Sequence, residues 1–149
     1  MEIPSDGLSD EEIRRILSMK NVAVVGMSRD PTKPAHFVPK FLLKHGYNVV
    51  PVNPFADEIL GLKTYPSLKD VPIEIDIVDI FRPSDQVYPV VSEALVKSPK
   101  VIWLQEGIYN EEAVRLAREN KIIVVWNRCL MKEHNRLFGS KPYISIRKL

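Results

Sequence analysis

The chain has 149 residues, of which 45% are hydrophobic and 27% are charged, so it is long enough for one well-buried core and too short for two comfortable domains. Its 21 basic and 19 acidic side chains give a net charge of +2, which argues against a long polyanion such as nucleic acid as the partner. The single cysteine, Cys129, excludes an intrachain disulfide and a cysteine-built metal site.

The N-terminal residues 1–7 carry neither a basic start nor an apolar run, so they lack the pattern of a targeting signal. No window of the sequence approaches the roughly 18 apolar residues of a membrane span. We therefore expect one unprocessed, soluble and cytoplasmic domain over residues 1–149, with no membrane and no metal among its partners.

A short β-branched run, Asn-Val-Ala-Val-Val at 21–25, ends in Gly26 and predicts a buried parallel strand that leads into a ligand loop. Later runs of similar character predict further strands at 47–52, 75–81, 100–104 and 121–126. Stretches with helical spacing precede or separate these runs, at 9–19, 37–45, 84–97 and 110–118. In the first of them, Ser9 and Glu12 have the spacing of a capping box.

Strands that alternate with helices of about ten residues call for right-handed crossovers, which give a parallel sheet covered on both faces. The expected fold class is therefore α/β, a Rossmann-like three-layer fold with a mainly parallel sheet. Its core is 21–133, with the helix 9–19 before it and an extension, 134–149, after it. Counting the weaker segment 61–66 as an edge strand, third along the chain, the expected spatial order is 3-2-1-4-5-6. In the extension, 143–147 is a further candidate edge strand.

A glycine directly after the first strand often begins a dinucleotide fingerprint. Here Gly26 supplies only the first glycine of G-x-G-x-x-G, so a pyrophosphate cannot approach that turn as closely. The second strand ends in the neutral residues 52–54, where an acid would accept hydrogen bonds from the ribose hydroxyls. Both departures argue against an ordinary nicotinamide site.

The loop after the first strand does offer groups that suit phosphate. Backbone N–H groups, the Ser28 hydroxyl and the cations Arg29 and Lys33 all precede a predicted helix start. The alternative for each of the two cations is a solvated surface charge. Gly26 is required by the turn under both interpretations.

Short segments that carry a resemblance to a known family occur in order along 21–133. They are Val-Gly-Met-Ser at 25–28, Gly-Tyr-Asn-Val-Val-Pro-Val-Asn-Pro at 46–54, Glu-Ile-Leu-Gly-Leu-Lys-Thr-Tyr at 58–65, Val-Asp-Ile-Phe-Arg at 78–82, Trp-Leu-Gln-Glu-Gly at 103–107 and Asn-Arg-Cys at 127–129. Together they resemble the small stand-alone coenzyme A-binding proteins. These are similar to the nucleotide-fold domain of the succinyl-coenzyme A synthetase α subunit.

The resemblance implies coenzyme A bound along the carboxyl ends of the strands. The implied contacts are loop positions for phosphopantetheine and diphosphate (Gly26, Met27, Ser28, Arg29), positions at the adenosine end (Val52, Asn53, Pro54), crevice positions (Phe81, Arg82) and positions along the pantetheine arm (Leu104, Gln105, Glu106). The family often has a lysine directly after the Asn-Pro turn, where this chain has Phe55. Lys33 is then the substitute counterion expected for the 3′-phosphate.

Other catalytic chemistry finds little support. Asp76 and Asp79 lie on opposite faces of their strand and make no carboxylate pair. The three histidines are expected to be partly exposed or capping residues. Cys129 is the one candidate nucleophile, because it follows the last strand and Arg128 could favour its thiolate, although a buried and inert thiol is the alternative. A mixed disulfide between Cys129 and the coenzyme thiol is a further hypothesis.

We therefore expect a protein that binds coenzyme A or an acyl-coenzyme A and has no catalytic residues of its own. One alternative is an NAD(P)-dependent reductase with an atypical glycine loop. Another is a detached subunit of an acyl-coenzyme A synthetase that works with a separate partner chain. A homo-oligomer is compatible with each of these functions.

Overall fold

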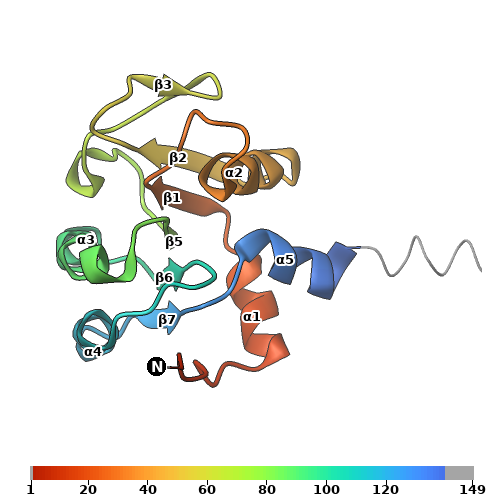
Figure 1. Cartoon of the computed structure of the whole chain (residues 1–149), viewed down its shortest axis with the longest axis vertical. Helices are drawn as coiled ribbons and strands as arrows, with labels where there is room; N and C mark the ends of the chain where they lie inside the picture. The colour runs from red at the N-terminus through yellow and green to blue at the C-terminus, as the bar shows by residue number, and fades with distance from the viewer. Residues whose placement is uncertain (1, 140–149) are drawn as a thin grey trace, which may run out of the picture.

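A computed structural model describes residues 2–139 and contains one five-stranded parallel sheet in the order β2-β1-β5-β6-β7 (Figure 1). The strands are β1 (Asn21–Val25), β2 (Asn48–Val52), β5 (Ile77–Ile80), β6 (Val101–Leu104) and β7 (Ile123–Val125). All four pairings between neighbours are parallel. The predicted α/β class is confirmed.

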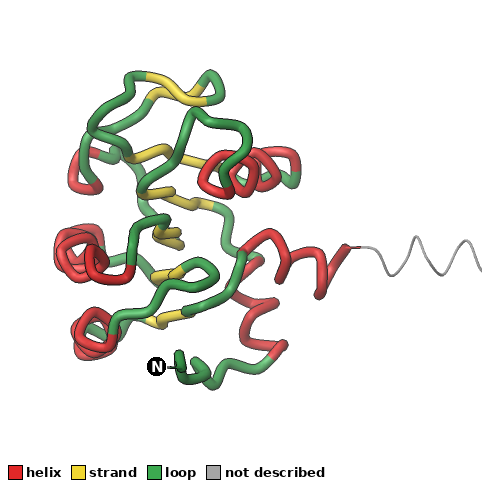
Figure 2. Tube along the Cα trace, in the orientation of Figure 1, coloured by secondary structure: helices red, strands yellow, loops and turns green. Residues whose placement is uncertain are grey.

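Helices cover both faces of this sheet and make three layers (Figure 2). One face carries α1 (Asp10–Leu17), α2 (Pro34–Lys44) and α5 (Leu130–His134), and the other carries α3 (Val87–Ala94) and α4 (Glu111–Glu119). Shorter helical turns are η1 (Leu68–Asp70), η2 (Ser84–Gln86), η3 (Leu95–Lys97) and the π-helical η4 (Asn135–Gly139). Alternate residues of each strand enter opposite core clusters, as the period of a strand requires.

Burial explains the composition of the central strands, and a capping box explains where α1 begins. Every residue of β5 and β6 is buried, which is why β6 is a continuous apolar run and β5 is apolar apart from Asp79. At the start of α1, the Ser9 hydroxyl accepts from the Glu12 N–H at 3.1 Å, and the Glu12 carboxylate accepts from the Ser9 N–H at 2.9 Å. The predicted capping box is thus present.

The expected strand order is wrong for the strand that is third along the chain, which was expected at the edge of the sheet. Instead of a full edge strand, 61–66 contributes β4 (Leu62–Lys63), which pairs antiparallel with β3 (Glu58–Ile59) in a separate hairpin. Only Tyr65 reaches the main sheet, as a single parallel bridge to Val52. Pro66 follows Tyr65 directly and marks the end of this short contact. The candidate strand 143–147 lies outside the described residues.

Asp79 is an unusual residue for the centre of a sheet. It is fully buried in β5, between Val24 of β1 and Trp103 of β6. Within residues 2–139, neither of its carboxyl oxygens has a hydrogen-bond partner. Burial raises the pKa of Asp79 well above its ordinary value of 3.8, because a charge is poorly solvated there.

Asp79 should therefore make the folded chain less stable as the pH rises. The unfolded carboxyl releases its proton near pH 3.8 while the folded one retains it, so between these two pKa values each pH unit favours unfolding by up to about 1.4 kcal/mol. Urea titrations between pH 4 and 7 should show this slope in the natural protein and lose it in Asp79→Asn. The exposed Asp85→Asn is the matched control and should keep the slope; parallel curves for the natural protein and Asp79→Asn would contradict this expectation.

Candidate functional site

Two adjoining cavities lie at the carboxyl ends of the central strands. The glycine-loop cavity has a volume of about 450 Å³ and is lined mainly by the loops after β1, β2 and β5. The apolar cavity has a volume of about 650 Å³ and lies between the start of α2, the loops after β5 and β6, and α5. They share the lining residues Lys33, Ala35, Phe81 and Arg82. Together they form one groove along the edge of the sheet where parallel α/β folds bind ligands.

Gly26 allows the first loop to leave the sheet. Its φ is +85°, and a Cβ atom at this position would lie 2.3 Å from the carbonyl oxygen of Phe81. The Gly26 N–H donates to the Val52 carbonyl at 3.1 Å, and the Phe81 N–H donates to the Val25 carbonyl at 2.9 Å. Only glycine therefore fits between the ends of β2, β1 and β5.

The loop after Gly26 is held by its own polar groups. The Ser28 N–H donates to the Ala35 carbonyl at 3.0 Å, and the Ser28 hydroxyl oxygen accepts from the Asp30 N–H at 3.0 Å. Nδ1 of His36 lies 2.8 Å from the Ser28 carbonyl oxygen, so this nitrogen carries the proton. His36 is buried rather than exposed or capping as expected, because its ring supports the loop from the first turn of α2.

Asn53 connects the second loop to the first. Its side-chain NH₂ donates to the Met27 carbonyl at 2.9 Å, and its Oδ1 accepts from the Phe55 N–H at 2.7 Å. One side chain thus fixes both the glycine loop and the turn that follows β2. Both of its polar groups already have protein partners.

Arg29, Lys33 and Arg82 line the groove without acidic partners. None of these cations has a carboxylate within ion-pair distance in the part of the chain that the structure describes. Arg29 is held in place by its Nε, which donates to the Glu58 carbonyl at 3.0 Å. Uncompensated positive charge around a cavity attracts anions, and guanidinium groups bind phosphate in particular.

The thirteen predicted site positions differ in whether they line the groove. Most of the thirteen line the groove: Gly26, Met27, Ser28, Arg29, Lys33, Asn53, Phe81, Arg82, Gln105 and Glu106. Val52, Pro54 and Leu104 do not line either cavity. The Met27 side chain is buried in the core, and the Gln105 side chain accepts from the Leu130 N–H at 3.4 Å.

Other residues that line the groove were not predicted from the sequence. They are Ala35, Phe55 and Ala56 in the glycine-loop cavity, and Pro34, Phe37, Pro83, Ile108, Met131 and Lys132 in the apolar cavity. Most are apolar residues without a motif, so only the fold brings them together. Lys132 pairs with Glu106 at 2.9 Å across the rim, and this hydrogen bond raises the pKa of Lys132.

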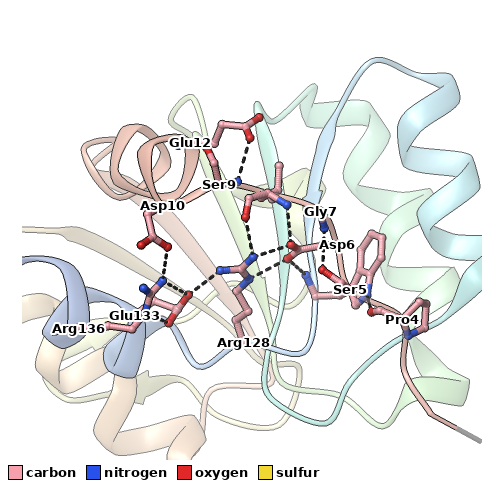
Figure 3. Close-up of polar contacts among 12 residues, drawn as sticks. Pro4, Ser5, Asp6, Gly7, Ser9, Asp10, Glu12, Arg128, Glu133 and Arg136 are labelled. Carbon is pink, nitrogen blue, oxygen red and sulfur yellow. Dashed lines mark hydrogen bonds and ion pairs between the residues drawn. The ribbon is translucent and has the colours of Figure 1, made fainter.

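Cys129 lines the apolar cavity, but Arg128 is engaged elsewhere. The Arg128 guanidinium donates to both oxygens of Asp6, at 2.6 and 2.9 Å, and to Glu133 at 2.7 Å (Figure 3). The Asp6 carboxylate raises the pKa of Arg128 by these hydrogen bonds. Arg128 therefore joins the N-terminal segment to α5 instead of serving the Cys129 thiol.

Comparison with known proteins identifies the family. The profile of the family described as the CoA binding domain matches residues 20–135. The chain belongs to this family. The resemblance on which we based the expected coenzyme A site is thereby confirmed, and the groove described above lies within the matched region.

Individual relatives agree with this assignment. The Bacillus subtilis protein YneT is 41% identical over 127 residues, which cover 85% of this chain and 94% of that protein. A solved Pyrococcus horikoshii protein is 47% identical with a TM-score of 0.89, covering 93% of this chain and 99% of that one. Acetate–CoA ligase [ADP-forming] II of Archaeoglobus fulgidus is 34% identical over 131 residues, or 86% of this chain and 19% of the ligase. This CoA-binding domain is thus homologous to part of an acyl-CoA ligase.

Among residues 2–139, no helix has the length and apolar character needed to cross a bilayer. The same part of the chain has no group of three or more His, Cys, Asp or Glu side chains arranged to hold a metal ion.

The Gly26 contact can be tested by Gly26→Ala, with Gly46→Ala as the matched control. Both glycines have a φ of +85°, but a Cβ at position 46 would meet nothing within 4 Å. Backbone strain of about 1 kcal/mol or more affects both variants, whereas only Gly26→Ala also forces β1 away from β5. We expect a clearly lower unfolding midpoint for Gly26→Ala in thermal denaturation. Equal midpoints for the two variants would contradict the close-approach argument.

Proposed function

We propose that this CoA-binding domain binds coenzyme A or an acyl-coenzyme A in the groove, with no catalytic residue of its own. The observation that carries the proposal is the pairing of two unlike cavities. Three cations without an ion-paired carboxylate in residues 2–139, Arg29, Lys33 and Arg82, line the glycine-loop cavity, and the adjoining cavity is mainly apolar. Coenzyme A has the same division, because an anionic nucleotide is joined to a longer and less polar arm.

Within this proposal the diphosphate lies over the glycine loop. Arg29, Lys33 and Arg82 supply the counter-charge there, and the Ser28 hydroxyl, whose oxygen accepts from the Asp30 N–H, still has its own proton to donate. The pantetheine arm then extends past Phe81 toward Gln105, Glu106 and Cys129 in the apolar cavity. The buried positions Met27, Val52 and Leu104 shape the groove through their backbone and core packing.

A nicotinamide dinucleotide is a poorer match for the same cavity. No acidic residue lines the glycine-loop cavity within residues 2–139, so ribose hydroxyls lack their usual carboxylate acceptor. Asn53 follows β2 where that acid would stand, and its amide is already bonded to Met27 and Phe55. These contacts support coenzyme A over the reductase alternative.

Isothermal titration of the full chain with coenzyme A, acetyl-coenzyme A and NAD tests the choice of ligand. We expect heat from the coenzyme A compounds that saturates at one ligand per chain, and no heat from NAD. Binding of NAD without binding of either coenzyme A compound would overturn the proposal.

Arg82→Ala should weaken binding of coenzyme A by about 10-fold or more, because a charge-assisted hydrogen bond to phosphate is lost. Arg82 is partly buried in the wall shared by the two cavities, so its charge acts at short range. Pantetheine, which has no phosphate, should bind the variant and the natural protein equally. Lys44→Ala, an exposed cation at the end of α2 that does not line the groove, is the control. An unchanged affinity of Arg82→Ala for coenzyme A would show that Arg82 does not hold a phosphate.

A second candidate function is favoured by the similarity to the Archaeoglobus fulgidus ligase. The matched region is about a fifth of the length of that ligase. In this case the chain is the coenzyme A-binding subunit of an acyl-coenzyme A ligase and works with a separate partner chain. We expect acetyl-coenzyme A to form from acetate only when a chain with the remainder of such a ligase is added. No product in any mixture would leave coenzyme A binding as the function of the chain alone.

A further inference from the structure

Phe55 is the most exposed large apolar side chain in residues 2–139. It is 90% exposed, yet it belongs to the lining of the glycine-loop cavity rather than to a surface away from any site. It takes no part in either hydrophobic core cluster. Covering an exposed aromatic ring with another flat ring removes apolar surface from water, which is favourable.

The backbone that carries this ring is held in place. The Phe55 N–H donates to Oδ1 of Asn53 at 2.7 Å, which closes a tight turn after β2. The NH₂ of the same amide donates to the Met27 carbonyl at 2.9 Å and so ties this turn to the glycine loop. The position of Phe55 relative to Gly26 and Ser28 is thus set by hydrogen bonds, although its side chain is open to solvent.

The residues around Phe55 indicate what kind of ligand would contact its ring. Its cavity also contains the guanidinium of Arg29, whose Nε is held by the Glu58 carbonyl, and the amine of Lys33. No carboxylate lines this cavity in the described part of the chain. A ligand that combines an anionic group with a flat aromatic ring matches both features, whereas a simple phosphate or a pantetheine arm uses only the charges.

We infer that Phe55 is the stacking platform for the adenine base of the ligand, so that this chain recognises the nucleotide end of coenzyme A by an aromatic face. The inference rests on the proposed function and adds a residue that contacts the nucleotide end of the same ligand. Stacking of a base on an aromatic side chain tolerates many bases and needs no hydrogen bond. The rest of the turn then serves to present the ring.

Affinity measurements with two ligands test the role of Phe55. Coenzyme A contains the adenosine end and 4′-phosphopantetheine does not. We expect Phe55→Ala to weaken coenzyme A by about 5- to 100-fold and to leave 4′-phosphopantetheine unchanged. Phe55→Trp should keep or improve affinity for coenzyme A. Tyr88→Ala, an exposed aromatic on α3 outside both cavities, should change neither ligand.

The outcomes separate this inference from the proposed function. Equal binding of coenzyme A by the natural protein and Phe55→Ala would overturn the inference and leave the proposed function intact. An equal loss for both ligands would also overturn it, since Phe55 would then shape the loop rather than stack. Failure of the natural protein to bind either ligand would overturn the proposed function, and the inference with it.

Fluorescence of Phe55→Trp gives a direct readout of stacking. The two natural tryptophans, Trp103 and Trp126, are buried, so the new indole is the exposed emitter. Adenosine 3′,5′-bisphosphate, the nucleotide half of coenzyme A, should quench this emission, and 4′-phosphopantetheine should not. Emission that stays unchanged when the bisphosphate is bound would overturn the inference.

Discussion

The close approach of Gly26 to the Phe81 carbonyl is the constraint on which the groove depends. Because position 26 has no Cβ, β1 can turn sharply while the end of β5 lies against it. The loops that follow these strands then leave the sheet side by side, one with Arg29 and the other with Arg82. A single backbone contact thereby brings together cations that are more than fifty residues apart in the sequence.

The same loops use most of their polar groups on one another. Ser28 and His36 stabilise the glycine loop, and Asn53 connects it to the next turn. Such internal bonding lowers the entropy that a ligand would have to remove, so the groove is largely formed in advance. Within residues 2–139, the terminal nitrogens of Arg29, Lys33 and Arg82 have no carboxylate within ion-pair distance and the ring of Phe55 is exposed, so a nucleotide can contact them.

Sequence patterns predicted the repeated strands and the capping box of α1, because both depend on local spacing. They were wrong about 61–66, where Leu60 and Gly61 both have positive φ and close a two-residue hairpin between Ile59 and Leu62. Leucine is an uncommon residue in such a turn, so local residue preferences do not predict this hairpin. The site was predictable where a loop follows a strand, but not where Ile108 or Met131 enters from a distant element.

Arg128 shows how the two cavities differ in what supports them. The strand ends and the hydrogen bond from Asn53 to the Met27 carbonyl hold the glycine-loop cavity in shape. The apolar cavity is lined by residues that come directly after Arg128, and Arg128 is paired with Asp6. The Asp6 carboxylate is almost completely buried, so losing its partner would leave an uncompensated charge that costs about 3–5 kcal/mol. This ion pair lies between α5 and a segment that precedes the matched family region of 20–135 (Figure 3). The wall that would face the thiol end of coenzyme A is therefore held in part by Asp6, which lies outside the matched family region, while the wall that would face the nucleotide is held by elements within that region.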